Sequence, residues 1–164
     1  MEIERKWNVT GWPEGLPVVR EQFMRQGYIH TRPTVRIREE QETGGGTEYI
    51  LCIKSSGDLA REEVEIPVDE DTFHTLERVI GLPLILKLRR TYGLPGGLRL
   101  EVNHVDEGLP TEFYYAEIEF DTEEEAESFV PEGILRTFLG EETTYLKGES
   151  MAAYWRKTRL KEEA

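Results

Sequence analysis

The chain lacks most of what a secreted, membrane-spanning or nucleic-acid-binding protein needs. Its 164 residues include a single cysteine, Cys52, so no internal disulfide can form. No apolar run approaches the roughly 20 residues of a membrane-spanning helix, and the N-terminus has neither region of a signal peptide. Lysine and arginine number 20 against 33 acidic residues, a net charge of −13. Since nucleic-acid binding needs a basic footprint, we expect a cytoplasmic protein that binds neither membrane nor nucleic acid.

The acidic surplus does not exclude a local basic pocket. Much of it lies in short runs at 69–71, 123–125 and 162–163, which are typical of solvated faces and helix starts. The length suits one domain with a real core. We therefore expect a single domain over residues 1–164, in which Cys52 is a buried, inert thiol.

Strand-like segments with an ionisable residue at every second position recur along the chain. Glu2, Glu4 and Lys6 share one face of such a strand, while Ile3 and Trp7 share the other. The same alternation places charged residues on one face of later strands. Those residues are Arg36, Arg38, Glu63, Glu65, Lys87, Arg89, Glu101, Glu117 and Glu119.

The turn signals between the strands predict an antiparallel, mainly β core. The expected strands are 2–8, 22–30, 33–41, 47–55, 61–68, 86–92, 97–105 and 113–121. Helices are expected at 70–80, 122–130 and 149–161, where apolar residues recur at helical spacing. These helices need an apolar sheet face to pack on.

Two architectures satisfy this pattern. A flat sheet would bury its apolar face under the helices and leave its charged face in water, and patterning alone favours this sheet because solvated strand faces are common. A closed barrel would instead turn the charged faces inward and the helices outward. That arrangement inverts the usual small barrel, whose interior is apolar.

The charges are also sorted by strand, which a solvated face does not require. Acidic pairs occupy 2/4, 63/65 and 117/119, whereas basic pairs occupy 36/38 and 87/89. Carboxylates are ligands for hard divalent cations, and arginine and lysine bind phosphate oxygens. The combination is what phosphoryl transfer requires.

In its ordered motifs the chain resembles the CYTH superfamily, the triphosphate tunnel metalloenzymes, over essentially its full length. The similar segments are Glu2-Ile3-Glu4-Arg5-Lys6, Arg36-Ile37-Arg38, Lys54, Arg61 with Glu63-Val64-Glu65, Lys87-Leu88-Arg89, Glu117-Ile118-Glu119 and Thr144-Tyr145-Leu146-Lys147. The resemblance implies a closed eight-stranded antiparallel β-barrel with a charged interior and helices packed outside. It favours the barrel over the flat sheet.

The resemblance also implies roles for individual residues. Metal ligands for Mg²⁺ or Mn²⁺ would be Glu2, Glu4 and Glu119. Substrate phosphates would be bound by Lys6, Arg36, Arg38, Lys54, Lys87, Arg89 and Lys147. The catalytic group would comprise Glu63, Glu65, Glu101 and Glu117. Of these, Glu117 would act through the water shell of the metal. The other three would orient water, hold a second cation or pair with Arg61.

One departure from the family pattern concerns the second cation. Where relatives often have Glu-x-Asp, this chain reads Glu101-Val102-Asn103, and an uncharged amide is a poorer metal ligand. His74 and His104 are expected to be structural, and His30 to lie at a tunnel mouth without a second ligand.

The expected function is divalent-metal-dependent hydrolysis of inorganic triphosphate or a related triphosphate compound. The alternatives are a class IV-type adenylate cyclase or a thiamine triphosphatase in the same fold, a non-catalytic polyphosphate-binding module, and a structural β-domain with solvated charges. The expected partner is a small anionic substrate, and a homodimer is possible by analogy.

Overall fold

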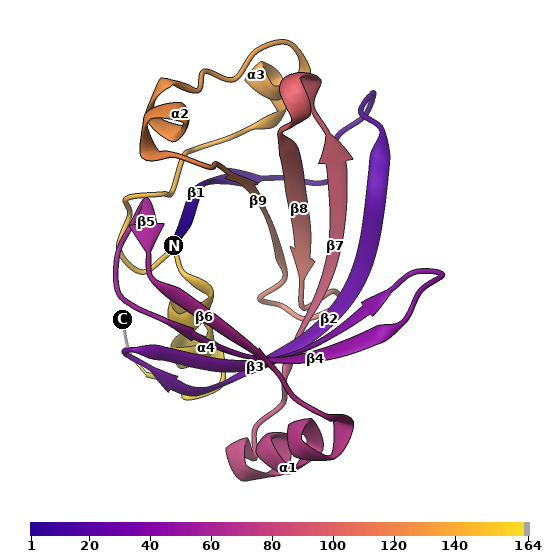
Figure 1. The fold of residues 1–164 in the computed structure, drawn as a ribbon, viewed down its shortest axis with the longest axis vertical. Helices are drawn as coiled ribbons and strands as arrows, with labels where there is room; N and C mark the ends of the chain where they lie inside the picture. The colour runs from indigo at the N-terminus through magenta and orange to yellow at the C-terminus, as the bar shows by residue number, and fades with distance from the viewer. Residues whose placement is uncertain (163–164) are drawn as a thin grey trace.

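The computed structural model describes residues 1–162 of the chain, and its strands curve round into a ring (Figure 1). The strands are β1 (Glu2–Val9), β2 (Val18–Thr31), β3 (Thr34–Glu42), β4 (Thr47–Lys54), β5 (Ala60–Arg61), β6 (Glu63–Pro67), β7 (Ile85–Gly93), β8 (Arg99–Val105) and β9 (Phe113–Glu119). Every pairing between them is antiparallel. The structure therefore confirms the mainly β prediction.

The sheet is almost closed on itself. Its order is β5-β1-β9-β8-β7-β2-β3-β4-β6, so its two edges are strands that follow one another in the chain. Arg61 of β5 pairs with Glu2, and Glu63 of β6 pairs with Lys54. The expected strand 61–68 thus changes neighbours at Glu62, which makes nine strands instead of eight. The predicted fold class, an antiparallel β-barrel, is confirmed, and the alternative prediction of a flat sheet is wrong.

The alternation of side chains turns apolar residues outward into two packed clusters. One cluster, centred on Trp7, Leu100 and Ile118, lies under the chain that follows β9. The other joins Ile37 of β3 to Phe73 and Trp155 from the helices. Burying the outer face leaves the charged residues between these positions to face inward.

The helices are α1 (Glu70–Ile80), α2 (Glu123–Ser128), α3 (Ile134–Phe138) and α4 (Met151–Thr158), with a 3₁₀ turn at Pro95–Gly97. Helix α1 has the expected bounds because Asp69 caps its N-terminus and Gly81, at φ 69°, ends it. Helices α2 and α4 are shorter than expected, and α3 was not predicted. Its five residues are too few for a periodic signal. Within residues 1–162, no helix has the length and apolarity that crossing a membrane requires.

Helix α4 differs from the expectation that the helices lie wholly outside. Its Trp155 ring packs 5.6 Å from the ring of Tyr28 on β2. Met151 and Ala152, in its first turn, line the central cavity. In Figure 1, α1 lies outside the ring of strands, whereas α4 packs against β2. The start of α4 therefore forms part of the cavity wall.

Candidate active site

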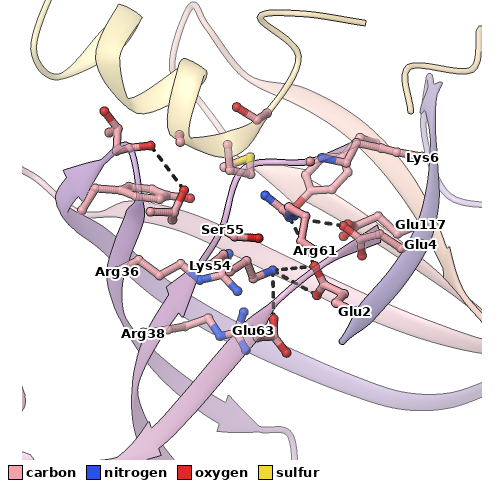
Figure 2. A pocket seen from close by; sticks show the side chains of 18 of the residues that line it. Glu2, Glu4, Lys6, Arg36, Arg38, Lys54, Ser55, Arg61, Glu63 and Glu117 are labelled. Carbon is pink, nitrogen blue, oxygen red and sulfur yellow. Dashed lines mark hydrogen bonds and ion pairs between the residues drawn. The ribbon is translucent and has the colours of Figure 1, made fainter. Parts of the chain in front are cut away.

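A cavity of about 1050 Å³ lies inside the barrel, and its lining includes every residue that the sequence predicted for the site. Figure 2 shows part of this lining, including Glu2, Glu4 and Lys54. These residues are Glu2, Glu4, Lys6, Arg36, Arg38, Lys54, Glu63, Glu65, Lys87, Arg89, Glu101, Glu117, Glu119 and Lys147. Their convergence agrees with a shared site. Their separate roles in metal binding, substrate binding and catalysis stay predictions.

Strand register brings the acidic residues of three strands together. Glu4 on β1 pairs with Glu119 on β9, and Glu117 pairs with both Lys6 on β1 and Glu101 on β8. Paired residues of neighbouring antiparallel strands point to the same face. One wall of the cavity is therefore rich in carboxylates.

The pKa values of two of these carboxyl groups are shifted in opposite directions. Burial, with Glu117 and Glu2 nearby, raises the pKa of Glu4 well above its usual range. Burial acts on Glu117 too, but Lys6 and Arg89 outweigh it and lower the pKa of Glu117. Of these two neighbouring carboxyl groups, Glu4 therefore holds a proton more readily than Glu117.

The crowding extends to Glu119. Burial and the charges of Glu2, Glu101 and Glu63 raise the pKa of Glu119. Like charges brought together in this way cost free energy unless a cation neutralises them. Carboxylate oxygens suit a hard divalent cation such as Mg²⁺ or Mn²⁺, so the donor chemistry of Glu2, Glu4 and Glu119 fits the predicted metal. Among residues 1–162, however, ligand oxygens of these three side chains do not all lie within 4.8 Å of one another.

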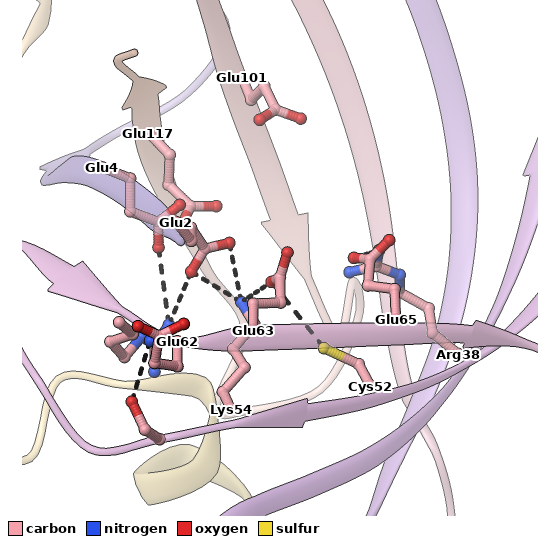
Figure 3. A network of polar contacts seen from close by, with 12 residues as sticks. Glu2, Glu4, Arg38, Cys52, Lys54, Glu62, Glu63, Glu65, Glu101 and Glu117 are labelled. Carbon is pink, nitrogen blue, oxygen red and sulfur yellow. Dashed lines mark hydrogen bonds and ion pairs between the residues drawn. The ribbon is translucent and has the colours of Figure 1, made fainter. Parts of the chain in front are cut away.

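Several carboxylates pair with cations across the cavity (Figure 3). The Nζ atom of Lys54 lies 3.0 Å from each carboxylate oxygen of Glu2 and 3.1 Å from Glu63. Arg61 contacts the same Glu2 at 3.2 Å. Burial alone would raise the pKa of Glu2, but Lys54 lowers it. Glu2 is therefore ionised, as a metal ligand must be.

Two arginines are paired in the same manner. Arg38 lies 2.6 Å from Glu40 and 3.8 Å from Glu65. Arg89 lies 2.8 Å from Glu101 and 3.6 Å from Glu117. Glu65 and Glu101, both predicted to be catalytic, are thus positioned beside basic groups predicted to bind phosphate.

Among the lining cations that the strands carry, three have no such partner in the described part of the chain. Within residues 1–162, no carboxylate oxygen lies within 4 Å of the charged atoms of Lys6, Arg36 or Lys87. The Nε atom of Arg36 is buried without a hydrogen bond. Burial, with Arg89 and Arg38 nearby, lowers the pKa of Lys87 well below its ordinary value. A buried cation such as Lys87, repelled by neighbouring arginines, needs an anion to neutralise it.

A second group of possible ligands differs from the predicted metal set. Cys52, Glu63 and Glu65 offer ligand atoms that all lie within 4.8 Å of one another. The thiol is buried, as predicted, and its pKa is raised chiefly by burial. Lys54 already pairs with Glu63 at 3.1 Å. A thiol suits softer metals than Mg²⁺, so this group does not replace Glu2, Glu4 and Glu119.

Asn103, the departure from the family pattern, does not line the cavity. It is fully buried, and its Oδ1 atom accepts a hydrogen bond from Nε of Arg89 at 2.8 Å. Asn103 therefore contacts Arg89, a residue predicted to bind phosphate. His104 stacks on Tyr114 at 4.0 Å, and His30 lies at the end of β2 with its ring 3.1 Å from the carbonyl oxygen of Pro33.

Sequence reasoning left Arg61, Tyr28 and Tyr115 out of the predicted site, although all three line the cavity. Tyr115 could have been found by parity, since it lies two residues before Glu117 on the same strand face. Arg61 could have been found beside Glu63 in the same way. Lys147 lies in an exposed loop at the end of the cavity formed by α4.

The CYTH domain profile matches residues 1–148 of this chain. The chain belongs to the CYTH family. The match ends before α4, so the helix that completes the cavity wall lies outside the CYTH domain as the profile defines it.

A relative and a solved structure agree with this family. The chain is 35% identical over 145 residues to the inorganic triphosphatase of Nitrosomonas europaea, covering 87% of this chain and 89% of that protein. The crystal structure of an inorganic triphosphatase superimposes with a TM-score of 0.61 at 30% identity, covering 94% of this chain and 93% of the other.

A more distant neighbour shows the fold alone. It is a putative adenylyl cyclase from Hippeastrum, described as having a dominant triphosphatase activity. Its TM-score is 0.58 at 17% identity, over 77% of this chain and 83% of the other. The CYTH barrel of this chain is therefore shared with proteins of more than one description.

Proposed function

We propose that this CYTH protein is a divalent-metal-dependent hydrolase of inorganic triphosphate or a closely related triphosphate compound, and that it releases phosphate. The observation that carries the proposal is a cavity whose lining combines a cluster of carboxylates with three strand cations, Lys6, Arg36 and Lys87, that have no carboxylate within 4 Å among residues 1–162. The similarity to an inorganic triphosphatase at 35% identity supports the same substrate class.

The basic residues would bind and align the phosphate chain. Lys6, Arg36 and Lys87 have no carboxylate within 4 Å in the part of the chain that the structure describes, so their charges are available to phosphoryl oxygens. Arg38, Lys54 and Arg89 would exchange or share their carboxylate partners when the anion enters. Arginine suits two-pronged contacts to phosphate, and lysine supplies a point charge.

The acidic residues would hold the metal and the nucleophile. Glu2, Glu4 and Glu119 would bind Mg²⁺ or Mn²⁺, and because the pKa of Glu4 is raised, the cation would compete with a proton for that carboxylate. Once bound, such a cation neutralises charge on the phosphoryl oxygens. Glu63, Glu65 or Glu101 would position a water molecule for attack on the terminal phosphorus. Catalysis would thus depend on positioning and charge neutralisation.

A phosphate-release assay tests the proposal. Tripolyphosphate, ATP, thiamine triphosphate and longer polyphosphate are each supplied with Mg²⁺ or Mn²⁺, and the products are separated by chromatography. We expect orthophosphate from tripolyphosphate and none after EDTA is added.

Other outcomes would replace the proposal. Cyclic nucleotide and pyrophosphate from ATP would indicate a cyclase. Orthophosphate from thiamine triphosphate alone would indicate a thiamine triphosphatase. Thermal stabilisation by tripolyphosphate without turnover under either metal would indicate a binding module. Absence of both turnover and stabilisation would indicate a structural domain.

A further inference from the structure

Tyr115 lies on the cavity wall between two lysines from other strands. It is on β9, and its side chain is almost fully buried. The Nζ atom of Lys6 on β1 lies 5.6 Å from the centre of its ring, and that of Lys87 on β7 lies 5.7 Å away. The two ammonium groups thus contact one phenol, which stabilises them by cation–π attraction.

Lys6 and Lys87 differ in their partners from three other cations of the cavity. Lys54, Arg38 and Arg89 each lie within 4 Å of carboxylates. Lys87 instead donates a hydrogen bond to the hydroxyl oxygen of Tyr115 at 3.0 Å. A neutral oxygen satisfies the geometry of an ammonium donor but does not cancel its charge, so Lys87 keeps its attraction for an anion.

The hydroxyl of Tyr115 has a proton left to donate. A phenol that accepts from an ammonium group directs its own O–H elsewhere. Over residues 1–162 no protein atom accepts that hydrogen, and the residue lines the cavity. Burial, with Glu117 nearby, raises the pKa of Tyr115 well above its ordinary value, so the group is a neutral donor.

We propose that Tyr115 is an additional substrate-binding residue, whose hydroxyl accepts from Lys87 and donates to a phosphoryl oxygen of the bound triphosphate. This inference rests on the proposed function, because it assigns a contact within the same cavity. It joins Lys6, Tyr115 and Lys87 into one row of donors contributed by β1, β9 and β7. A phosphoryl group in this row receives two positive charges and one neutral hydrogen bond.

The test is a calorimetric titration with tripolyphosphate in EDTA, where metal-dependent turnover cannot proceed. We expect Tyr115→Phe, which keeps the ring and loses the hydroxyl, to weaken binding by roughly tenfold, the usual effect of one hydrogen bond to a charged group. Tyr115→Leu also loses the ring and should bind more weakly still. Tyr114→Phe is the matched control, because Tyr114 lies outside the cavity against His104.

The outcomes separate this inference from the proposed function. A wild-type protein that does not bind tripolyphosphate would contradict both. A wild-type protein that binds, with Tyr115→Phe binding equally well, would overturn only the role of Tyr115. Each variant is compared with its own ligand-free unfolding midpoint, so a loss of fold is recognised.

A second pair of variants tests the alternative that the Tyr115 hydroxyl only positions Lys87 and does not contact the anion. Lys87→Met is compared with Lys87→Met/Tyr115→Phe, which leaves no unpartnered group behind. The double variant should bind tripolyphosphate several-fold more weakly than Lys87→Met, because the contact from Tyr115 is lost as well. Equal affinities would show that Tyr115 has no contact of its own with the anion, and would contradict the proposal.

Discussion

The carboxylate of Asp106 accepts hydrogen bonds from both terminal nitrogens of the Arg159 guanidinium, at 2.7 and 3.1 Å. Asp106 follows the last residue of β8, and Arg159 follows the last residue of α4. Both side chains are almost fully buried, and Tyr154 donates a further hydrogen bond to the same carboxylate at 2.6 Å. This ion pair therefore holds α4 against the barrel. The first turn of α4 lines the cavity.

We predict that Arg159→Met destabilises the protein by about 3 kcal/mol, because it leaves a buried carboxylate without its countercharge. Urea unfolding measures the change. Lys157→Met, an exposed change on the same helix, is the control and should have little effect. Equal stability of the two variants would show that α4 is held by its apolar contacts alone.

The same ion pair predicts a dependence on pH. Burial alone would raise the pKa of Asp106, but hydrogen bonds from Arg159 and Tyr154 lower it below its usual value. A lowered pKa stabilises the fold above the unfolded value of about 4, and this stabilisation is lost as the pH falls through the folded value. Asp106→Asn should therefore unfold with a weaker dependence on pH below 4 than the wild type. An unchanged acid profile would contradict this.

We predict that Glu4→Gln abolishes phosphate release without unfolding the barrel. The amide keeps the shape of the side chain and removes one predicted metal ligand. Because the pKa of Glu4 is raised, its ionisation destabilises the metal-free fold as the pH rises. In EDTA at pH 8, Glu4→Gln should thus be at least as stable as the wild type. Full Mg²⁺-dependent turnover by this variant would remove Glu4 from the metal site.

We predict that Lys87→Met weakens tripolyphosphate binding and stabilises the ligand-free protein. The pKa of Lys87 is lowered chiefly by burial, so charging it costs folding free energy whenever the unfolded side chain is protonated. The gain should be about 1–3 kcal/mol at pH 7 and should vanish above about pH 10.5. Urea unfolding at both pH values measures it. A variant destabilised at pH 7 would show that the contact with Tyr115 outweighs the burial cost.

We predict that Gly27→Ala destabilises the protein by about 2 kcal/mol through overpacking between β2 and α4. A Cβ atom at this position would lie 2.5 Å from Cδ2 of Leu84 and 3.4 Å from the ring of Trp155. Gly46→Ala is the control, since nothing lies within 4 Å of its Cβ. Thermal unfolding compares the two, and a neutral Gly27→Ala would mean that Leu84 relaxes at little cost.

Local patterns predicted the strands well because their cause is local. The alternation of Glu2, Ile3 and Glu4 assigns each side chain to a face whatever the partner strand is. The bounds of α1 followed from its caps at Asp69 and Gly81 in the same way. By contrast, α3 is a short turn of helix that only its packing on the barrel stabilises, and no periodicity marks it.

Local sequence patterns could not predict which residues pair with one another across the cavity. Lys54 and Glu2 are far apart in the sequence, and only closure of the sheet through β5 and β6 brings them to 3.0 Å. The position of Tyr115 between two lysines depends on the order of strands in the sheet, because Lys6 comes from β1 and Lys87 from β7.

The amino-acid sequence by itself determined which residues share a strand face, and hence that a charged surface and an apolar surface had to exist. The tertiary structure alone decided that the charged surface encloses a cavity, that α4 completes its wall, and which cations lack a countercharge. The physical reason is that side-chain alternation depends on the backbone of one strand, whereas enclosure and ion pairing depend on contacts between residues far apart in the chain.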